Sequence, residues 1–136
     1  MMLIGSLVIL LILTLCFAAG VSWWLRRRVI RLRDEFIDYV LHHVSKTVKQ
    51  LPRIQQIMEY DKVLDHILSE LGYRGTLSQK MQQYQKKFTI DQSTWDAHRE
   101  RNKLAHEIGY APIHRAVDYH VKALEREVER ILERHS

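Results

Sequence analysis

The residues around position 100 combine side chains that can carry out proton transfer beside a phosphate group. Residues 95–107 read WDAHRERNKLAHE and contain Arg101, Asn102 and His106. An arginine side chain offers a planar cationic fork that matches phosphate oxygens. A histidine can take or give a proton near neutral pH, and Asn102, the only asparagine of the chain, can orient either group.

The spacing of apolar residues predicts that residues 95–108 form a helix with Arg101 on its inner side. Arg101 shares the apolar side of this helix, and arginine is seldom found on such a side. Asn102 and His106 are four residues apart and lie along a neighbouring line of the same helix. The apolar side consists of Ala97, Leu104, Ala105 and Ile108.

The segment RNKLAH at residues 101–106 resembles the motif of the HEPN superfamily (higher eukaryotes and prokaryotes nucleotide-binding). Many members of this family of small helical bundles have Arg, four to six residues and then His, often with a polar residue after the Arg. The resemblance covers residues 35–134 as a fold and six residues as a motif. It implies a metal-independent endoribonuclease that uses the ribose 2′-hydroxyl as nucleophile at a dimer cleft. Arg101 would stabilise the phosphate, Asn102 would orient either the phosphate or His106, and His106 would act as acid and base.

Two other interpretations of these residues stay open. In a non-catalytic dimerisation or interaction module, Arg101 would pair with an acid such as Glu107 or Asp118, and His106 would close the helix. In an RNA-binding or nucleotide-binding bundle, the same residues would hold phosphate without turnover. Modification of a tyrosine by a nucleotidyltransferase is not expected, because Ile108 stands where family members of that kind carry a tyrosine.

The sequence contains no recognisable metal or cofactor motif. The eight histidines include His98, which has helical spacing to Asn102 and His106, but there is no HExxH segment. A phosphate-cradling glycine loop is also missing, and Cys16 is the single cysteine. We expect neither a metal nor a cofactor, and a disulfide scaffold is excluded.

Apolar residues at steps of three and four run through residues 37–131 and predict an all-α protein. Pro52 is expected to end or kink the first amphipathic helix, and Gly72 to stop the second. Thr76 is a predicted N-cap, and Gly109 a predicted C-terminal stop. These signals predict an antiparallel bundle of four to five helices.

The first 25 residues are mostly apolar and carry no charged side chain. About 20 apolar residues are enough to span a bilayer, so this segment predicts a transmembrane signal anchor. The membrane-interface residues would be Trp23, Trp24, Arg26, Arg27 and Arg28. The arginines on one flank predict a plasma (inner) membrane protein whose C-terminal domain is cytoplasmic. A cleaved signal peptide is the alternative, but it would need basic residues before the apolar run.

The predicted organisation is a transmembrane helix at 1–25, a basic juxtamembrane and amphipathic stalk helix at 26–52, and a helical bundle at 53–136. Much of the net charge of +5 comes from the arginines after the apolar segment, so charge alone is weak support for nucleic-acid binding. The expected partners are membrane lipid and a second copy of the chain. RNA and an unidentified protein are further candidate partners.

Overall fold

The structure is a computed structural model that describes residues 12–21 and 30–136. The chain divides into two compact units, Met1–Ile30 and Arg31–Ser136. Across the described ranges the backbone forms helices, turns and loops, and no strand. The prediction of an all-α helical bundle is therefore confirmed.

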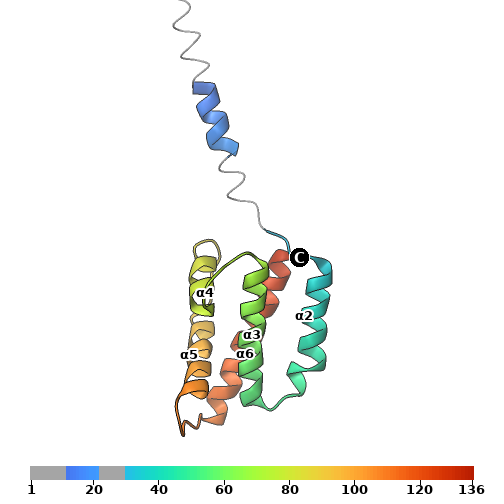
Figure 1. Cartoon of the computed structure of the whole chain (residues 1–136), viewed down its shortest axis with the longest axis vertical. Helices are drawn as coiled ribbons and strands as arrows, with labels where there is room; N and C mark the ends of the chain where they lie inside the picture. Colours follow the sequence, from blue (N-terminus) through green and yellow to red (C-terminus); the bar gives the residue numbers. More distant parts are fainter. Residues whose placement is uncertain (1–11, 22–29) are drawn as a thin grey trace, which may run out of the picture. The chain divides into compact units, whose positions relative to one another are not determined.

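The second unit contains five α-helices and one short 3₁₀ helix, joined by short loops. In chain order they are α2 (Asp34–Lys46), η1 (Val48–Gln50), α3 (Arg53–Glu70), α4 (Leu77–Gln85), α5 (Gln92–His106) and α6 (His114–His135). The main contacts of α6 are with α3 and α5, and α3 also packs on α4 and α5. Figure 1 shows α4 and α5 following one another along one side of the bundle.

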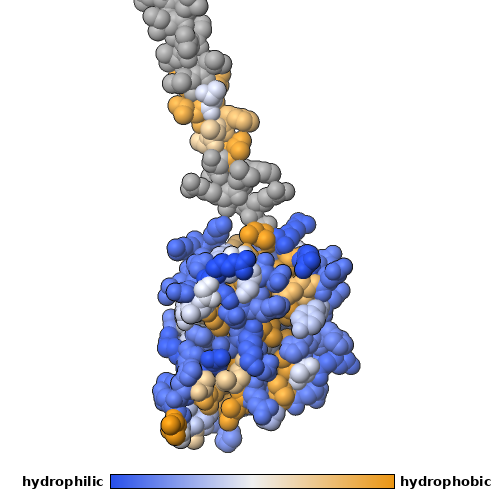
Figure 2. Space-filling model, viewed as in Figure 1, coloured by the Kyte–Doolittle hydropathy of each residue, from blue (hydrophilic) through white to orange (hydrophobic). Residues whose placement is uncertain are grey.

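The apolar sides of these helices meet in one core. Ile57 and Leu64 of α3 and Val121 and Leu124 of α6 are all 0% exposed. Phe36 of α2 is also buried, so α2, which falls in the predicted stalk at residues 26–52, contributes to this core. In the view of Figure 2 the surface of the second unit is mainly hydrophilic, with smaller apolar areas between. Burial of the apolar sides thus holds the helices in their positions.

The start of α4 is set by a capping box. Thr76 Oγ1 accepts a hydrogen bond from the Gln79 amide, and the Gln79 side chain accepts one from the Thr76 amide at 2.9 Å. The predicted N-cap at Thr76 is confirmed. Before it, Gly72 has a φ of 89°, a left-handed conformation that suits glycine at a helix end. These two signals place Ser78 in the first turn of α4.

We correct the prediction that residues 1–25 form a transmembrane signal anchor. Of the helices in residues 12–21 and 30–136, none is long and apolar enough to cross a membrane. A transmembrane helix needs about 20 predominantly apolar residues in succession.

The other predictions that depended on this segment change with it. The predicted inner-membrane localisation with a cytoplasmic C-terminal domain is not retained, because no described helix can provide the anchor. Residues 1–11 and 22–25 of the predicted span lie outside the described residues. The same holds for the predicted interface residues Trp23, Trp24, Arg26, Arg27 and Arg28. The predicted lipid contact is untested.

Candidate functional site

A pocket of about 850 Å³ opens between α2, α3, the start of α4 and α5. Its wall includes Asp61 of α3 and Ser78 of α4. From α5 it includes His98, Arg101 and Asn102, which follow one another within two helical turns. The pocket therefore brings together two of the three residues that the sequence predicts as catalytic.

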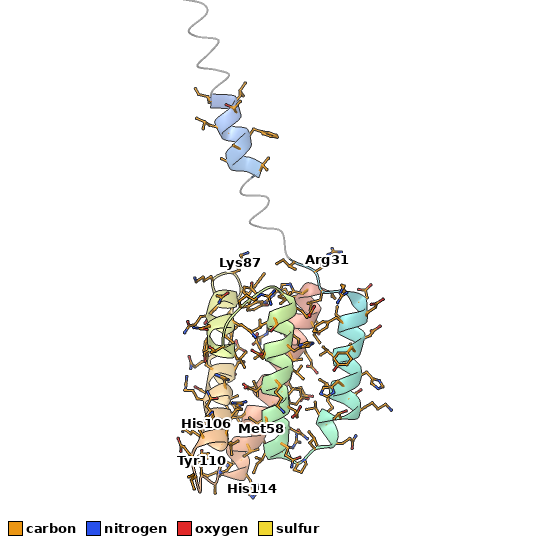
Figure 3. All side chains as sticks on the ribbon, viewed as in Figure 1. Arg31, Met58, Lys87, His106, Tyr110 and His114 are labelled. Carbon is orange, nitrogen blue, oxygen red and sulfur yellow. The ribbon has the colours of Figure 1, made fainter. Side chains whose placement is uncertain are left out.

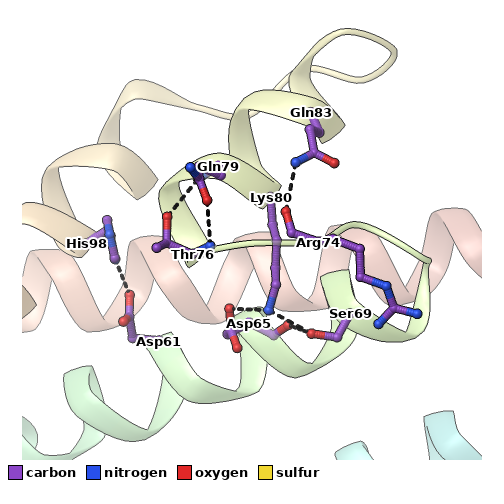
Figure 4. A network of polar contacts seen from close by, with 9 residues as sticks. All are labelled: Asp61, Asp65, Ser69, Arg74, Thr76, Gln79, Lys80, Gln83 and His98. Carbon is purple, nitrogen blue, oxygen red and sulfur yellow. Dashed lines mark hydrogen bonds and ion pairs between the residues drawn. The ribbon is translucent and has the colours of Figure 1, made fainter.

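A buried carboxylate and a buried imidazole form the centre of this site. Asp61 is 4% and His98 is 7% exposed. His98 Nδ1 lies 2.8 Å from Asp61 Oδ1 (Figure 4), and the opposite ring nitrogen, Nε2, lies 3.0 Å from Ser78 Oγ. A carboxylate, an imidazole and a hydroxyl thus form one continuous chain of hydrogen bonds.

Arg101 binds the second oxygen of the same carboxylate. Its Nε lies 3.1 Å from Asp61 Oδ2, but Nε is also a buried atom without a well-aligned hydrogen bond. We treat this contact as an ion pair, because the distance is short and the two charges are opposite. The acid is Asp61 rather than Glu107 or Asp118. The side chain of Arg101 remains 25% exposed, so part of the guanidinium can meet a ligand.

Asn102 links the arginine to the histidine. Its Oδ1 accepts a hydrogen bond from Arg101 Nη1 at 3.2 Å, and its Nδ2 lies 3.3 Å from His98 Nε2. An amide nitrogen only donates, so in this arrangement Nε2 of His98 is an acceptor. The imidazole proton then lies on Nδ1 and is donated to Asp61.

His106 stands apart from these residues. It is the last residue of α5, is exposed, and does not line the pocket. Figure 3 shows His106 near Tyr110 and His114 at one end of the bundle. Five residues separate it from Arg101, which corresponds to about 140° around the helix axis. The structure brings Arg101 and Asn102 together and leaves His106 outside.

A second polar network fixes α4 against α3 beside the pocket. Lys80 Nζ lies 2.7 Å from Asp65 Oδ1 and donates a hydrogen bond to Ser69 Oγ at 2.8 Å (Figure 4). Lys80 is 8% exposed, so its ammonium requires these partners. The network holds the first turn of α4, and with it Ser78, in place over α3.

The end of α5 is closed by Tyr110. Its hydroxyl donates a hydrogen bond to Glu100 Oε1 at 2.5 Å, and this bond is the main cause that raises the pKa of Tyr110 above its usual 10.0. Tyr110 therefore serves to tie the loop after α5 to the helix.

Sequence reasoning missed Asp61 and Ser78, and it considered His98 only as a metal ligand. Within residues 12–21 and 30–136, no three His, Cys, Asp or Glu side chains are placed to hold a metal ion. The only local signal for the site was the four-residue spacing between His98 and Asn102. Nothing in the sequence near Asp61 or Ser78 indicates that they meet His98.

Comparison of the chain with protein-family models, curated proteins and solved structures finds no match. The HEPN resemblance therefore remains a prediction from residues 101–106 and the order of the helices.

Proposed function

We propose that the second unit, Arg31–Ser136, binds RNA at this pocket and cleaves it without a metal ion. The observation that supports the proposal is the placement of Arg101 and Asn102, which line the pocket side by side and are hydrogen-bonded to each other. A volume of about 850 Å³ lies within the range of small-ligand sites. One nucleotide of a single strand is a suitable occupant.

Arg101 supplies positive charge for a phosphodiester in a pocket whose wall also includes the carboxylates of Glu59, Asp61 and Asp65. The exposed part of the Arg101 guanidinium can stabilise the charge that develops on the phosphate oxygens. Ser78 lies in the first turn of α4, so the amide end of this helix also faces the pocket and favours an anion. Asn102 can hold the phosphate in register with Arg101.

His106 keeps its proposed acid–base role only through a second copy of the chain. Within one copy it lies outside the pocket. A dimer in which two α5 helices face each other, as the resemblance implies, would bring His106 of one copy toward the pocket of the other. Two-fold symmetry would then complete both sites at once.

A non-catalytic interaction module is the second candidate function. It is favoured by the ion pair between Arg101 and Asp61, which provides a structural reason for the inward arginine. It is also favoured by Ile108 and Ile113, which are 105% and 77% exposed in the connection between α5 and α6. Exposed aliphatic side chains so close together are typical of a contact surface.

The test is cleavage of a labelled single-stranded RNA by the full chain in the presence of chelator. We expect Arg101→Lys, which keeps the charge but loses the planar guanidinium donors, to lower the cleavage rate at least tenfold. His106→Ala should lower the rate by a similar factor. Arg99→Ala is the matched control, because Arg99 is an exposed arginine of α5 that pairs with Asp96 and does not line the pocket. No cleavage by the wild-type chain, or equal cleavage by all variants, would leave the interaction module as the better explanation.

A further inference from the structure

The hydrogen bonds that link Asp61, His98 and Ser78 are those expected around a histidine that acts as a general base. The carboxylate holds Nδ1 of the imidazole at 2.8 Å, and a hydroxyl lies at Nε2, 3.0 Å away. The hydrogen bond that His98 Nδ1 donates to Asp61 selects the tautomer, and the carboxylate would stabilise the imidazolium that forms when Nε2 takes a proton. His98 is thus arranged to remove a proton from a hydroxyl in the pocket.

The surroundings of Nε2 agree with this assignment. Asn102 Nδ2 also approaches Nε2, at 3.3 Å, which requires a lone pair on that nitrogen. Arg101, on the other oxygen of Asp61, holds the carboxylate in place. The burial of Asp61 and His98 strengthens their electrostatic interaction relative to water.

We infer that His98, oriented by Asp61, is the base that takes the proton from the ribose 2′-hydroxyl during RNA cleavage. The 2′-hydroxyl would take the position that Ser78 Oγ holds against Nε2, and the Ser78 side chain would turn aside. This inference rests on the proposed function and assigns its proton acceptor to a residue outside the 101–106 motif. It also specifies the substrate class as RNA, since a deoxyribose has no hydroxyl at this position.

The 2′-O–H bond breaks and its proton moves to His98 Nε2, while the 2′-oxygen bonds to phosphorus and the bond from phosphorus to the 5′-oxygen breaks. The departing 5′-oxygen takes a proton from His106 of the second copy, to which the proposed function gives the acid–base role. Water then takes the proton from His98 and returns one to His106, so both imidazoles regain their starting protonation. The products are a 2′,3′-cyclic phosphate and a 5′-hydroxyl.

The kinetic test uses the full chain in chelator with a labelled oligoribonucleotide and its all-deoxy counterpart. We expect His98→Gln to lower kcat at least 100-fold, the usual range for loss of a general base, and to abolish the rise of kcat/KM with pH on the acidic side. His42→Gln is the matched control and should keep kcat, since His42 is exposed on α2 and does not line this pocket.

A second measurement does not depend on activity. Nitrogen-15 NMR of the histidine rings in the full chain should show His98 at neutral pH with its proton on Nδ1 and a bare Nε2. A proton on Nε2 in the neutral ring would overturn the inference. This spectrum also shows whether His98→Gln has lost activity through unfolding, because the other histidine signals should stay in place.

The outcomes separate the two proposals. If the wild-type chain cleaves RNA and His98→Gln keeps the same rate and pH profile, the inference fails and the proposed function stands. If the wild-type chain cleaves no RNA, both fail. Covalent labelling of Ser78 by a fluorophosphonate, lost in His98→Gln, would overturn the inference in favour of acyl transfer with Ser78 as the nucleophile.

Discussion

Replacing Asp61 by asparagine should destabilise the bundle far more than removing a surface carboxylate. Asp61 is 4% exposed and binds both His98 Nδ1 and Arg101 Nε. In Asp61→Asn the side-chain oxygen can still accept from His98, but the new amide N–H groups then face the Arg101 N–H group. The variant therefore keeps the contact with His98 and loses the ion pair with Arg101. It also places two hydrogen-bond donors against each other, with no acceptor between them.

The size of the effect follows from burial. Breaking a buried ion pair by changing one partner costs about 3–5 kcal/mol. Because the Arg101 side chain is 25% exposed, water can replace part of the lost interaction, and we expect about 2–3 kcal/mol. In a domain near 100 residues each kcal/mol shifts Tm by about 4–8 °C, so Tm should fall by about 10–20 °C.

The assay is urea and thermal unfolding of the full chain, arranged as a double-mutant cycle with Arg101→Gln. We expect a coupling free energy of at least about 1 kcal/mol between the two positions. Asp96→Asn is the matched control, because Asp96 pairs with the exposed Arg99 on the surface of α5, and it should change stability by less than about 0.5 kcal/mol. A loss below about 1 kcal/mol for Asp61→Asn, or no coupling to Arg101, would refute the description of the site as a buried, mutually dependent pair.

Two further predictions concern the framework around the site. Glu127 is 1% exposed, and burial is the largest cause that raises its pKa. The folded state therefore holds this proton more tightly than the unfolded state does. The free energy of unfolding should fall as the pH rises from the pKa of Glu127 in the unfolded chain to its higher pKa in the folded chain. In urea titrations between pH 4 and 7, Glu127→Gln should reduce this fall, because the variant has no carboxyl to ionise at this position, although it also loses the ion pair with Arg130. Equal pH slopes for both chains would contradict this. Thr76→Ala should lower the free energy of unfolding by about 1 kcal/mol, because it removes the N-cap of α4. Thr76→Ser keeps a capping hydroxyl and should lower it much less. Equal urea midpoints for the two variants would show that the cap contributes nothing.

The helices and their ends could be read largely from local patterns. The capping box at Thr76 and the positive φ of Gly72 and Gly109 depend on residues within a few positions of one another, so local sequence is sufficient to predict them. The partly buried position of Arg101 agrees with its helical spacing from the buried Ala97, but Ala105 and Ile108 of the predicted apolar side are exposed. The N-terminal anchor was predicted from composition, and no described helix has the length and apolarity that a span requires.

The sequence by itself determined an all-α bundle and placed Arg101, Asn102 and His106 on one helix, since both follow from spacing along the chain. Only the tertiary structure decided that Arg101 and Asn102 join Asp61, His98 and Ser78 while His106 stays outside. His98 lies 37 residues from Asp61 and 20 residues from Ser78, and no local pattern specifies contacts over such separations. The packing of α3, α4 and α5 around a shared core brings these side chains within hydrogen-bonding distance, and with them the base that the proposed reaction requires.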